Sequence, residues 1–492
     1  MNVYWTVGNP IPRNVMKWSK SLFAVLLPLL LHAPQGQAQT ATISWNTVHQ
    51  VINGFGAADA QKGASMSSAN QQFFYGTGAG QLGLTILRVG INDGPGGNDY
   101  GSAGCTTTSS GCAGPYISDM QYAASQGALI YGSPWSPPAA YKTNGAISCT
   151  SNAGLSSSDY AAYATWLSNW VQSVVTYASV TPFAISVQNE PDQCQAYDSA
   201  VWTSSQLQTF ITNDLGPAFS SAGLSTYIFM PENGSYGAIT GSDGGGSCMT
   251  TSSCYSYVSG VNWHDYDANY SAPDTVNSTP YPSGWASGML YWETEVAAGP
   301  GYGPNAPGCS GGQWCPGVAD MLMWAAIVDD RIVNEGANAW LYWTLITPDN
   351  DNEGLMNPSG SPTVALRTYM LGQYAKFIRP GFYRIDATHV PQNGVTVSAY
   401  KDSSSGALII IATNYTSSSV TQTFTLSGAT ALSVMPWITD ATQNLAQQTS
   451  VSVTNGSFTY TLPAGSITSF VGTTTVASSL PAPPTGLTAT TH

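Results

Sequence analysis

The stretch Phe183-Ala184-Ile185-Ser186-Val187-Gln188-Asn189-Glu190-Pro191 holds the strongest single signal for the fold. Its first five residues are mostly apolar, and a short apolar run that stops at a proline is typical of a buried strand in a parallel sheet. Pro191 lacks an N–H and disfavours helical geometry at Glu190, so we expect the strand to end there. Glu190 would then lie at the carboxyl end of a strand, where barrels of parallel strands carry their catalytic side chains.

Seven further runs resemble this one, and segments with helical periodicity separate several of them. The eight predicted strands are 51–57, 84–90, 128–133, 183–190, 226–232, 261–266, 289–295 and 337–343. Apolar residues recur at helical spacing in 159–177, 204–221 and 320–334. Strands that alternate with helices indicate parallel βα units, and eight of them predict an α/β protein with a closed (β/α)8 barrel over residues 52–378.

The composition changes after about residue 379. Short strand-like runs with Ser/Gly turns follow one another without helical periodicity as far as residue 472, which predicts a β-sandwich over 379–472. Residues 473–492 are rich in Thr, Ala and Pro and are interpreted as a linker. Within them, 483–487 resembles the start of a fibronectin type III repeat. A further strand is expected within 39–51, before the barrel series.

Charged residues are unusually scarce. Only 8% of the 492 residues are charged, against about a quarter in an average protein, and the formal net charge is -14. A negative charge of this size argues against binding to nucleic acid or to an anionic membrane. A surface filled instead by Thr, Ser, Asn, Gln and Gly is typical of secreted proteins that act on neutral polymers.

The first 38 residues have the features of a secretory signal. Lys17 and Lys20 precede the apolar run 22–31, and Gly36-Gln37-Ala38 offers a small-x-small cleavage site. Met16 would open a more typical signal than Met1. The run is too short for a spanning helix, so we favour secretion over an N-terminal anchor.

All eight cysteines follow the signal, and an even count in a secreted chain suggests disulfides. Eight cysteines allow about 105 pairings, so sequence does not fix the connectivity. The most economical set joins partners close in sequence and leaves Cys149 for Cys194, which follow neighbouring strands. That set is 105–112, 149–194, 248–254 and 309–315.

A second carboxylate is available on the seventh predicted strand. Cleavage of a glycosidic bond needs one carboxyl group to protonate the leaving oxygen and another to attack the sugar or activate water. Glu293 and Glu295 both lie on this strand and, two residues apart, face the same side. Glu295 is nearer the carboxyl end and is therefore the preferred partner of Glu190.

Four motifs together resemble glycoside hydrolase family 30, over roughly residues 41 to 472. They are Asn53-Gly54-Phe55-Gly56, Ser133-Pro134-Trp135-Ser136-Pro137-Pro138, Ser186-Val187-Gln188-Asn189-Glu190-Pro191 and Trp292-Glu293-Thr294-Glu295. The resemblance implies a retaining β-glycanase with Glu190 as general acid/base and Glu295 as nucleophile, without metal or other cofactor. It also implies that the β-sandwich flanks the barrel and that the strand in 39–51 joins it.

The resemblance implies further site residues. Asn189 would hydrogen-bond the sugar 2-hydroxyl, and Trp135 and Trp343 would stack on sugar rings. Arg88 and Tyr266 would keep the nucleophile ionised and oriented. His264 would line the same wall. Lys142 lies in a segment, 137–144, that is similar to the xylan-cleaving members.

The glycan is less clearly indicated. The family includes enzymes for glucuronoxylan, xylan, β-1,6-galactan, β-1,6-glucan and glucosylceramide. Recognition of a glucuronate branch needs a fixed cation, which the bacterial glucuronoxylanases of the family supply as an arginine after strand eight. The corresponding segment here, 347–362, contains no Arg or Lys.

We therefore expect a monomeric, secreted endo-β-1,4-xylanase that binds a polysaccharide without strict dependence on glucuronate. A β-1,6-galactanase or β-1,6-glucanase is the close alternative. A non-catalytic glycan-binding surface protein is the alternative of another class.

Overall fold

The structure is a computed structural model that describes residues 39–60, 65–91, 105, 110–266, 281–299, 302–309, 312–347 and 351–475. The expected signal and residues 476–492 of the terminal linker, with its fibronectin-like start, lie outside these residues. No helix among the described residues combines the length and the apolar character needed to cross a membrane.

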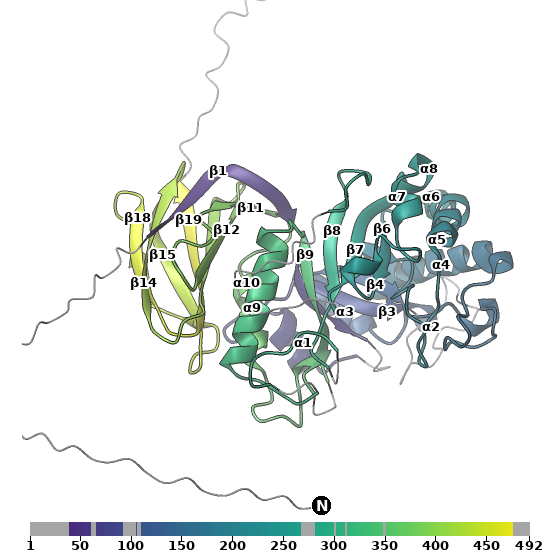
Figure 1. Ribbon diagram of the computed structural model, residues 1–492, viewed down its shortest axis with the longest axis horizontal. Coiled ribbons are helices and arrows are strands. Elements are labelled where there is room, and N and C mark those ends of the chain that lie inside the picture. Colours follow the sequence, from purple (N-terminus) through teal and green to yellow (C-terminus); the bar gives the residue numbers. More distant parts are fainter. Residues whose placement is uncertain are drawn as a thin grey trace, which may run out of the picture. The chain divides into compact units, whose positions relative to one another are not determined.

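Eight parallel strands close into a barrel, as the sequence predicts (Figure 1). The ring closes where β8 pairs with β9, and β10 (Gly354–Met356) pairs with the carboxyl-terminal end of β9. The barrel strands are β2 (Gly54–Asp59), β3 (Ile86–Ile91), β4 (Leu129–Pro134), β5 (Ala184–Ser186), β6 (Tyr227–Asn233), β7 (Val258–His264), β8 (Leu290–Glu295) and β9 (Ala339–Ile346).

The fourth barrel strand is shorter than predicted. The sequence suggests a strand over 183–190, but regular β5 covers only Ala184–Ser186. Beyond it the backbone still bonds to both neighbours, since Asn189 N donates to Pro134 O at 2.8 Å and Glu190 N to Glu232 O at 3.0 Å. The irregularity ends in Glu190 itself, whose φ of 47° is left-handed.

Helices surround the barrel. The predicted helix over 204–221 consists of α5, a π-helical turn at Ile211–Leu215 and α6. In α4, Trp170 packs so closely on Gly132 of β4 that a Cβ there would lie 2.6 Å from the indole ring, which explains the glycine. The helices are α1 (Ser68–Tyr75), α2 (Ser110–Ala113), α3 (Ile117–Ser125), α4 (Tyr160–Ala178), α5 (Ser204–Phe210), α6 (Gly216–Ser221), α7 (Gly246–Met249), α8 (Ser252–Tyr255), α9 (Val318–Val333) and α10 (Leu366–Ala375).

The inside of the barrel is filled with side chains. Trp292 of β8 stacks on Phe183 at an interplanar angle of 5° and meets Phe229 edge-on. With Ile86, Tyr131, Ala184, Ala339 and Leu341 they form a separate buried cluster. This apolar cluster fills the barrel below the carboxyl rim that carries the polar groups of the pocket.

The remaining strands form a β-sandwich around an aromatic core in which Phe424, Phe458 and Phe470 contact one another. In Figure 1 the purple β1 lies among the yellow and green sandwich strands, as expected; it pairs with β11 and β14. The strands are β1 (Thr40–Ile52), β11 (Phe382–Ala387), β12 (Val395–Asp402), β13 (Ala407–Asn414), β14 (Val420–Ser427), β15 (Thr430–Thr439), β16 (Ala446–Gln447), β17 (Val451–Ser452), β18 (Ser457–Leu462) and β19 (Ser466–Thr475).

The predicted runs 395–400, 407–412, 420–426, 431–437 and 457–462 correspond to β12, β13, β14, β15 and β18, whereas β11, β16, β17 and β19 have no predicted counterpart. β19 runs to Thr475, slightly into the predicted linker. The sandwich meets α10 through β19 and β15, because the Gln373 amide of that helix lies within hydrogen-bonding distance of Ser469 in β19 and Thr439 in β15.

The eight cysteines form the four disulfides that the sequence favours, namely 105–112, 149–194, 248–254 and 309–315. Cys149 follows β4 and Cys194 follows β5, so this bond links two adjacent loops of the rim.

Candidate active site

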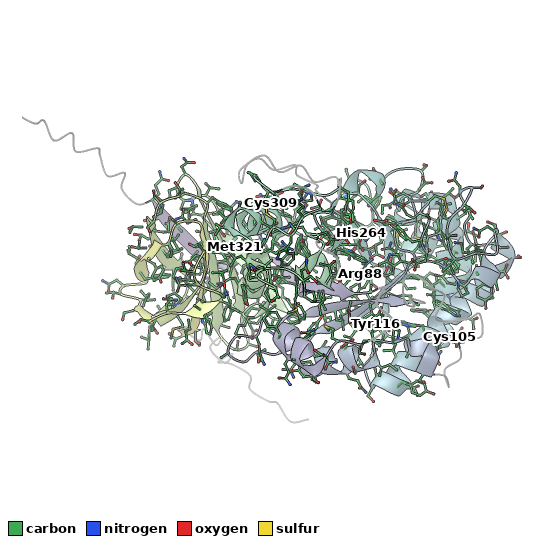
Figure 2. All side chains as sticks on the ribbon, turned by 90° about the horizontal axis from the view of Figure 1, so that it is seen from below. Arg88, Cys105, Tyr116, His264, Cys309 and Met321 are labelled. Carbon is green, nitrogen blue, oxygen red and sulfur yellow. A yellow bond between two sulfur atoms is a disulfide. The ribbon has the colours of Figure 1, made fainter. Side chains whose placement is uncertain are left out.

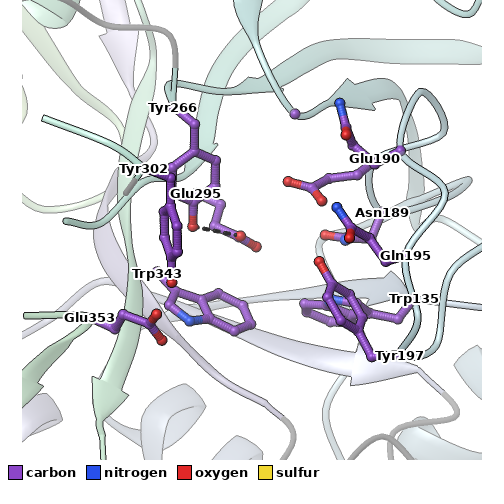
Figure 3. Close-up of a pocket in the computed structure, with 12 residues that line it drawn as sticks. Trp135, Asn189, Glu190, Gln195, Tyr197, Tyr266, Glu295, Tyr302, Trp343 and Glu353 are labelled. Atoms are coloured by element: carbon purple, nitrogen blue, oxygen red, sulfur yellow. Dashed lines mark hydrogen bonds between the residues drawn. The ribbon is translucent and has the colours of Figure 1, made fainter. Parts of the chain in front are cut away.

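A pocket of about 500 Å³ opens at the carboxyl ends of the barrel strands (Figure 3). Both predicted catalytic glutamates line it, together with Asn189, Trp135, Trp343 and Tyr266 from the predicted set. The lining residues are Trp135, Asn189, Glu190, Gln193, Gln195, Tyr197, Gly234, Tyr266, Glu295, Tyr302, Trp343 and Glu353.

Glu190 and Glu295 face each other across this pocket (Figure 3). One carboxylate oxygen of each, with a ring nitrogen of His264, forms a group of atoms that all lie within 4.8 Å of one another. Retaining glycosidases hold their carboxyl groups about 5–5.5 Å apart, whereas inverting ones leave about 6.5–9.5 Å for a water. The short separation is therefore suited to direct attack by a carboxylate.

Glu190 is held in a strained backbone conformation. Its positive φ is rare for a residue with a side chain, and such strain persists only where the surroundings fix it. Here the N–H groups of Asn189 and Glu190 donate to Pro134 of β4 and Glu232 of β6, and the Glu190 carbonyl accepts from Gln193 N at 2.9 Å. The side chain is fixed as well, because Oε1 lies 3.0 Å from Nδ1 of His264.

Glu295 sits at the end of β8 and has two donors. Arg88 Nη1 donates to one oxygen and Tyr266 OH donates to the other at 2.9 Å. Burial raises the pKa of Glu295, and the positive charges of His264 and Arg88 limit that rise. These contacts agree with the predicted partners of this carboxylate.

Arg88 and His264 are fully buried and are not among the residues that line the pocket; Figure 2 labels both within the molecule. Besides Glu295, Arg88 contacts Asn189, whose Oδ1 accepts from Nη2 at 2.5 Å. Burial lowers the pKa of His264, but the charge of Glu295 and the contacts with Glu190 and Glu232 outweigh it and raise it to about 10. The imidazole is therefore a second fixed cation.

The sequence prediction misses the residue that anchors both cations, Glu232. This fully buried carboxylate lies 3.4 Å from Arg88 Nη2 and 3.8 Å from His264 Nε2. It also accepts from Tyr131 OH at 2.8 Å and from Ser133 Oγ at 2.6 Å. Although burial acts to raise its pKa, Arg88 and these contacts lower it to about 2.

A signal for Glu232 was present in the sequence. Glu232 ends a predicted strand, as Glu190 does, and shares its left-handed backbone with a φ of 60°. A carboxylate at the end of a barrel strand is a functional candidate wherever it occurs.

The structure distinguishes Glu293 from Glu295. Glu293 is fully buried below the pocket, where it accepts from the backbone N–H groups of Glu295 at 3.0 Å and Leu341 at 3.1 Å. Burial and the charge of Asp265 raise its pKa well above the ordinary value. Glu293 thus holds the backbone of β8 and β9, and Glu295 alone of the two reaches the pocket.

Trp135 and Trp343 form one wall of the pocket. Their ring centroids lie 5.7 Å apart at an angle of 51°, and the Arg88 guanidinium lies 4.5 Å from the Trp135 ring. Indole faces of this kind give flat C–H surfaces of sugars a large, stiff contact.

Lys142, in contrast, does not line the pocket. Its ammonium is buried and donates to three backbone carbonyls, those of Ile147, Ser148 and Ser199. The prediction that Lys142 contacts substrate is therefore not supported by its position. The residue instead ties together the loops that follow β4 and β5.

Glu190, His264 and Glu295 also have the spacing of a metal site. The imidazole would have to release the proton that the neighbouring carboxylates stabilise before it could bind a metal ion, and Arg88 adds a positive charge beside it. The cluster is better suited to handling protons between carboxylates.

The comparisons with known proteins agree with this geometry. Residues 109–302 match the Glycosyl hydrolase family 30 TIM-barrel domain. The glucuronoxylanase XynC of Bacillus subtilis (strain 168) is 29% identical over 441 residues, which cover 88% of this chain and 92% of that relative. The endo-1,6-β-D-glucanase BGN16.3 of Trichoderma harzianum is 25% identical over 393 residues, covering 70% and 75%.

Among solved structures, the family 30 subfamily 8 xylanase Xyn30A of Clostridium acetobutylicum superimposes with a TM-score of 0.72. It is 29% identical, and the match covers 88% of this chain and 99% of that one. The strand-end carboxylate pair in a (β/α)8 barrel with an attached sandwich agrees with these matches: the chain is a glycosyl hydrolase, and the matches support its membership of glycoside hydrolase family 30.

Proposed function

We propose that the protein is a secreted, retaining endo-β-1,4-xylanase that does not depend on glucuronate branches. The observation that carries the catalytic part is the approach of Glu190 and Glu295 to within 4.8 Å in a pocket walled by tryptophans. Residues 52–378 would carry the catalysis and 379–472 would support it. The four disulfides and the signal-like first 38 residues support secretion.

The reaction would proceed in two displacements. Glu190 gives its proton to the glycosidic oxygen while a Glu295 oxygen attacks the anomeric carbon, so the C–O bond to the leaving chain breaks as the bond to Glu295 forms. Glu190, now ionised, then removes a proton from a water that attacks the same carbon and releases Glu295. Asn189, held by Arg88, lies beside Glu190 and is the candidate to bind the sugar 2-hydroxyl.

The cations of the chain support a substrate without acidic branches. Every Lys or Arg that the structure describes is engaged inside the protein. Arg88, Arg331 and Arg367 pair with buried carboxylates, Arg384 donates to the Gln50 side chain, and Lys142, Lys376, Arg379 and Lys401 donate to backbone carbonyls. None of them lines the pocket, so among these residues nothing offers a glucuronate carboxylate a free cationic partner.

The β-1,6-glucanase alternative rests on the Trichoderma harzianum relative, whose identity is only slightly lower. A panel of linear xylan, glucuronoxylan, β-1,6-glucan and β-1,6-galactan separates the alternatives when products are identified by chromatography. We expect xylo-oligosaccharides from both xylans, at first with retained β-configuration by NMR. Release from β-1,6-glucan alone would refute the xylanase, and binding without any release would favour a glycan-binding protein.

A further inference from the structure

One pocket residue has no role in the chemistry described so far. Glu353 follows β9 and lines the same pocket as the two catalytic glutamates, close to Trp343 (Figure 3). Its side chain is half-buried, and its carboxylate has no hydrogen bond or ion pair within the described part of the chain. A carboxylate that is partly removed from water without a partner is costly unless a ligand completes it.

The backbone around Glu353 is firmly held. Arg367 donates to Asn352 Oδ1 at 2.8 Å and to Gly354 O at 2.5 Å, which fixes the residues on both sides. Asn352 Nδ2 donates to Asp320 at 2.9 Å, and Arg367 also pairs with Asp320 at 2.7 Å. Glu353 is therefore presented to the pocket by a rigid support, as is expected of a residue that recognises a ligand.

The charge of Glu353 affects the pKa values of neighbouring groups. Burial and the charge of Glu295 raise the pKa of Glu353. Burial and the surrounding carboxylates, with Glu353 among them, likewise raise the pKa of the pocket residues Tyr197 and Tyr266. A carboxylate on the sugar would be repelled by the negative charge of Glu353 and would find no cation to pair with among the described residues that line this part of the pocket.

We infer that Glu353 is a specificity-determining residue that accepts hydrogen bonds from hydroxyl groups of an uncharged sugar and repels sugars that carry a carboxylate. This inference rests on the proposed glycanase function. It adds that the sugar bound beside Trp343 is uncharged. Glu353 is a binding residue and takes no part in bond cleavage.

The charge part of the inference can be tested with a matched substrate pair, glucuronoxylan and the same polymer after reduction of its carboxyl groups to alcohols. At low ionic strength we expect wild type to prefer the reduced polymer by about tenfold in kcat/KM, since like charges about 10 Å apart repel this strongly near a protein surface. Glu353→Gln should bring the ratio close to one. Asp386→Asn makes the same charge change on an exposed sandwich residue and should leave the ratio unchanged.

The hydroxyl part is tested on linear xylan. Glu353→Ala should raise KM by about tenfold or more with little change in kcat, because it removes a charged acceptor. Equal thermal melting of the variants would show that the fold is intact. If Glu353→Gln leaves the charge ratio as in wild type, or Glu353→Ala leaves KM within twofold, the inference is wrong.

Failure of the proposed function gives a different result. If wild type cleaves β-1,6-glucan and not xylan, the xylanase is refuted, and the effect of Glu353→Ala on KM is then measured on that glucan. If wild type cleaves no polymer of the panel, the proposed glycanase function and the inferred role of Glu353 are both overturned.

Discussion

The barrel rim and the β-sandwich are stabilised in opposite ways. At the rim, three carboxylates, Glu190, Glu232 and Glu295, surround Arg88 and His264, and two of the three residues have a left-handed backbone. In the sandwich, Phe424, Phe458 and Phe470 contact one another within an apolar core. The rim holds groups that destabilise one another when unpaired, whereas the sandwich holds groups that all favour burial.

This difference indicates which region serves activity and which serves stability. Strain and crowded charges in a native protein are tolerated mostly at functional sites, and the rest of the structure compensates for them. Substitutions at the rim should therefore change the rate more than the fold, and substitutions in the sandwich the reverse.

The largest effect on rate should come from Glu295→Gln. The amide keeps the size but cannot attack the anomeric carbon, so we expect kcat/KM to fall on the order of 10⁴-fold or more. Glu293→Gln is the matched control two residues away. It weakens one backbone contact of Glu293 and should cost about tenfold or less. Initial rates on the best polymer of the panel measure both, and equal losses would show that the assignment of the nucleophile is unsafe.

Glu232→Gln should have an intermediate effect. It removes the charge that both Arg88 and His264 share, and breaking buried pairs of this kind costs about 3–5 kcal/mol. Because the two cations also orient Glu190 and Glu295, we expect kcat to fall about 10- to 100-fold with a smaller change in KM. An unchanged kcat in a folded variant would contradict a positioning role for Glu232.

The Glu232→Gln variant should also differ from wild type in the pH dependence of its stability. The folded-state pKa of His264 is raised to about 10, so the stability it contributes is complete below its ordinary value near 6.5 and is lost as pH rises toward 10. Without Glu232 the folded-state pKa of His264 should fall, so the loss of stability should be smaller and should end at a lower pH. Melting temperatures of wild type and variant between pH 6 and 10 measure this. Parallel curves would show that Glu232 does not stabilise the imidazolium.

The smallest effect on rate should come from Phe470→Ala in the sandwich. Deleting a fully buried aromatic ring typically costs about 3–5 kcal/mol. The urea midpoint should fall accordingly, while kcat/KM of the folded enzyme at 25 °C stays within twofold of wild type. A large loss of activity with little loss of stability would mean that the sandwich shapes the active site directly.

Much of the fold was predictable because its signals are local. All eight barrel strands are apolar runs that end in turn or polar residues, and α4 and α9 show clear helical periodicity. The exceptions are places where tertiary contacts override local pattern. β5 ends before the left-handed backbone at Glu190, and β11 and β19 pair with β1 and β13, which are distant in the sequence.

The site residues were predictable only where a functional side chain lies at the end of a strand. Glu190 and Glu295 end strands and could be found, whereas Tyr197, Tyr302 and Glu353 come from loops whose course the sequence does not reveal. Lys142 was misassigned because the three carbonyls that hold it come from residues scattered along two loops. A lysine that serves as a structural link looks, in sequence, like one that faces a ligand.

The disulfides have a consequence for redesign of the rim. Three of the four disulfides join two cysteines of the same connection between consecutive barrel strands, so each of these loops contains both partners of its disulfide. A loop of this kind can be exchanged without a matching change of cysteine elsewhere in the chain. The loops that follow β4 and β5 share Cys149–Cys194 and would have to be transplanted together.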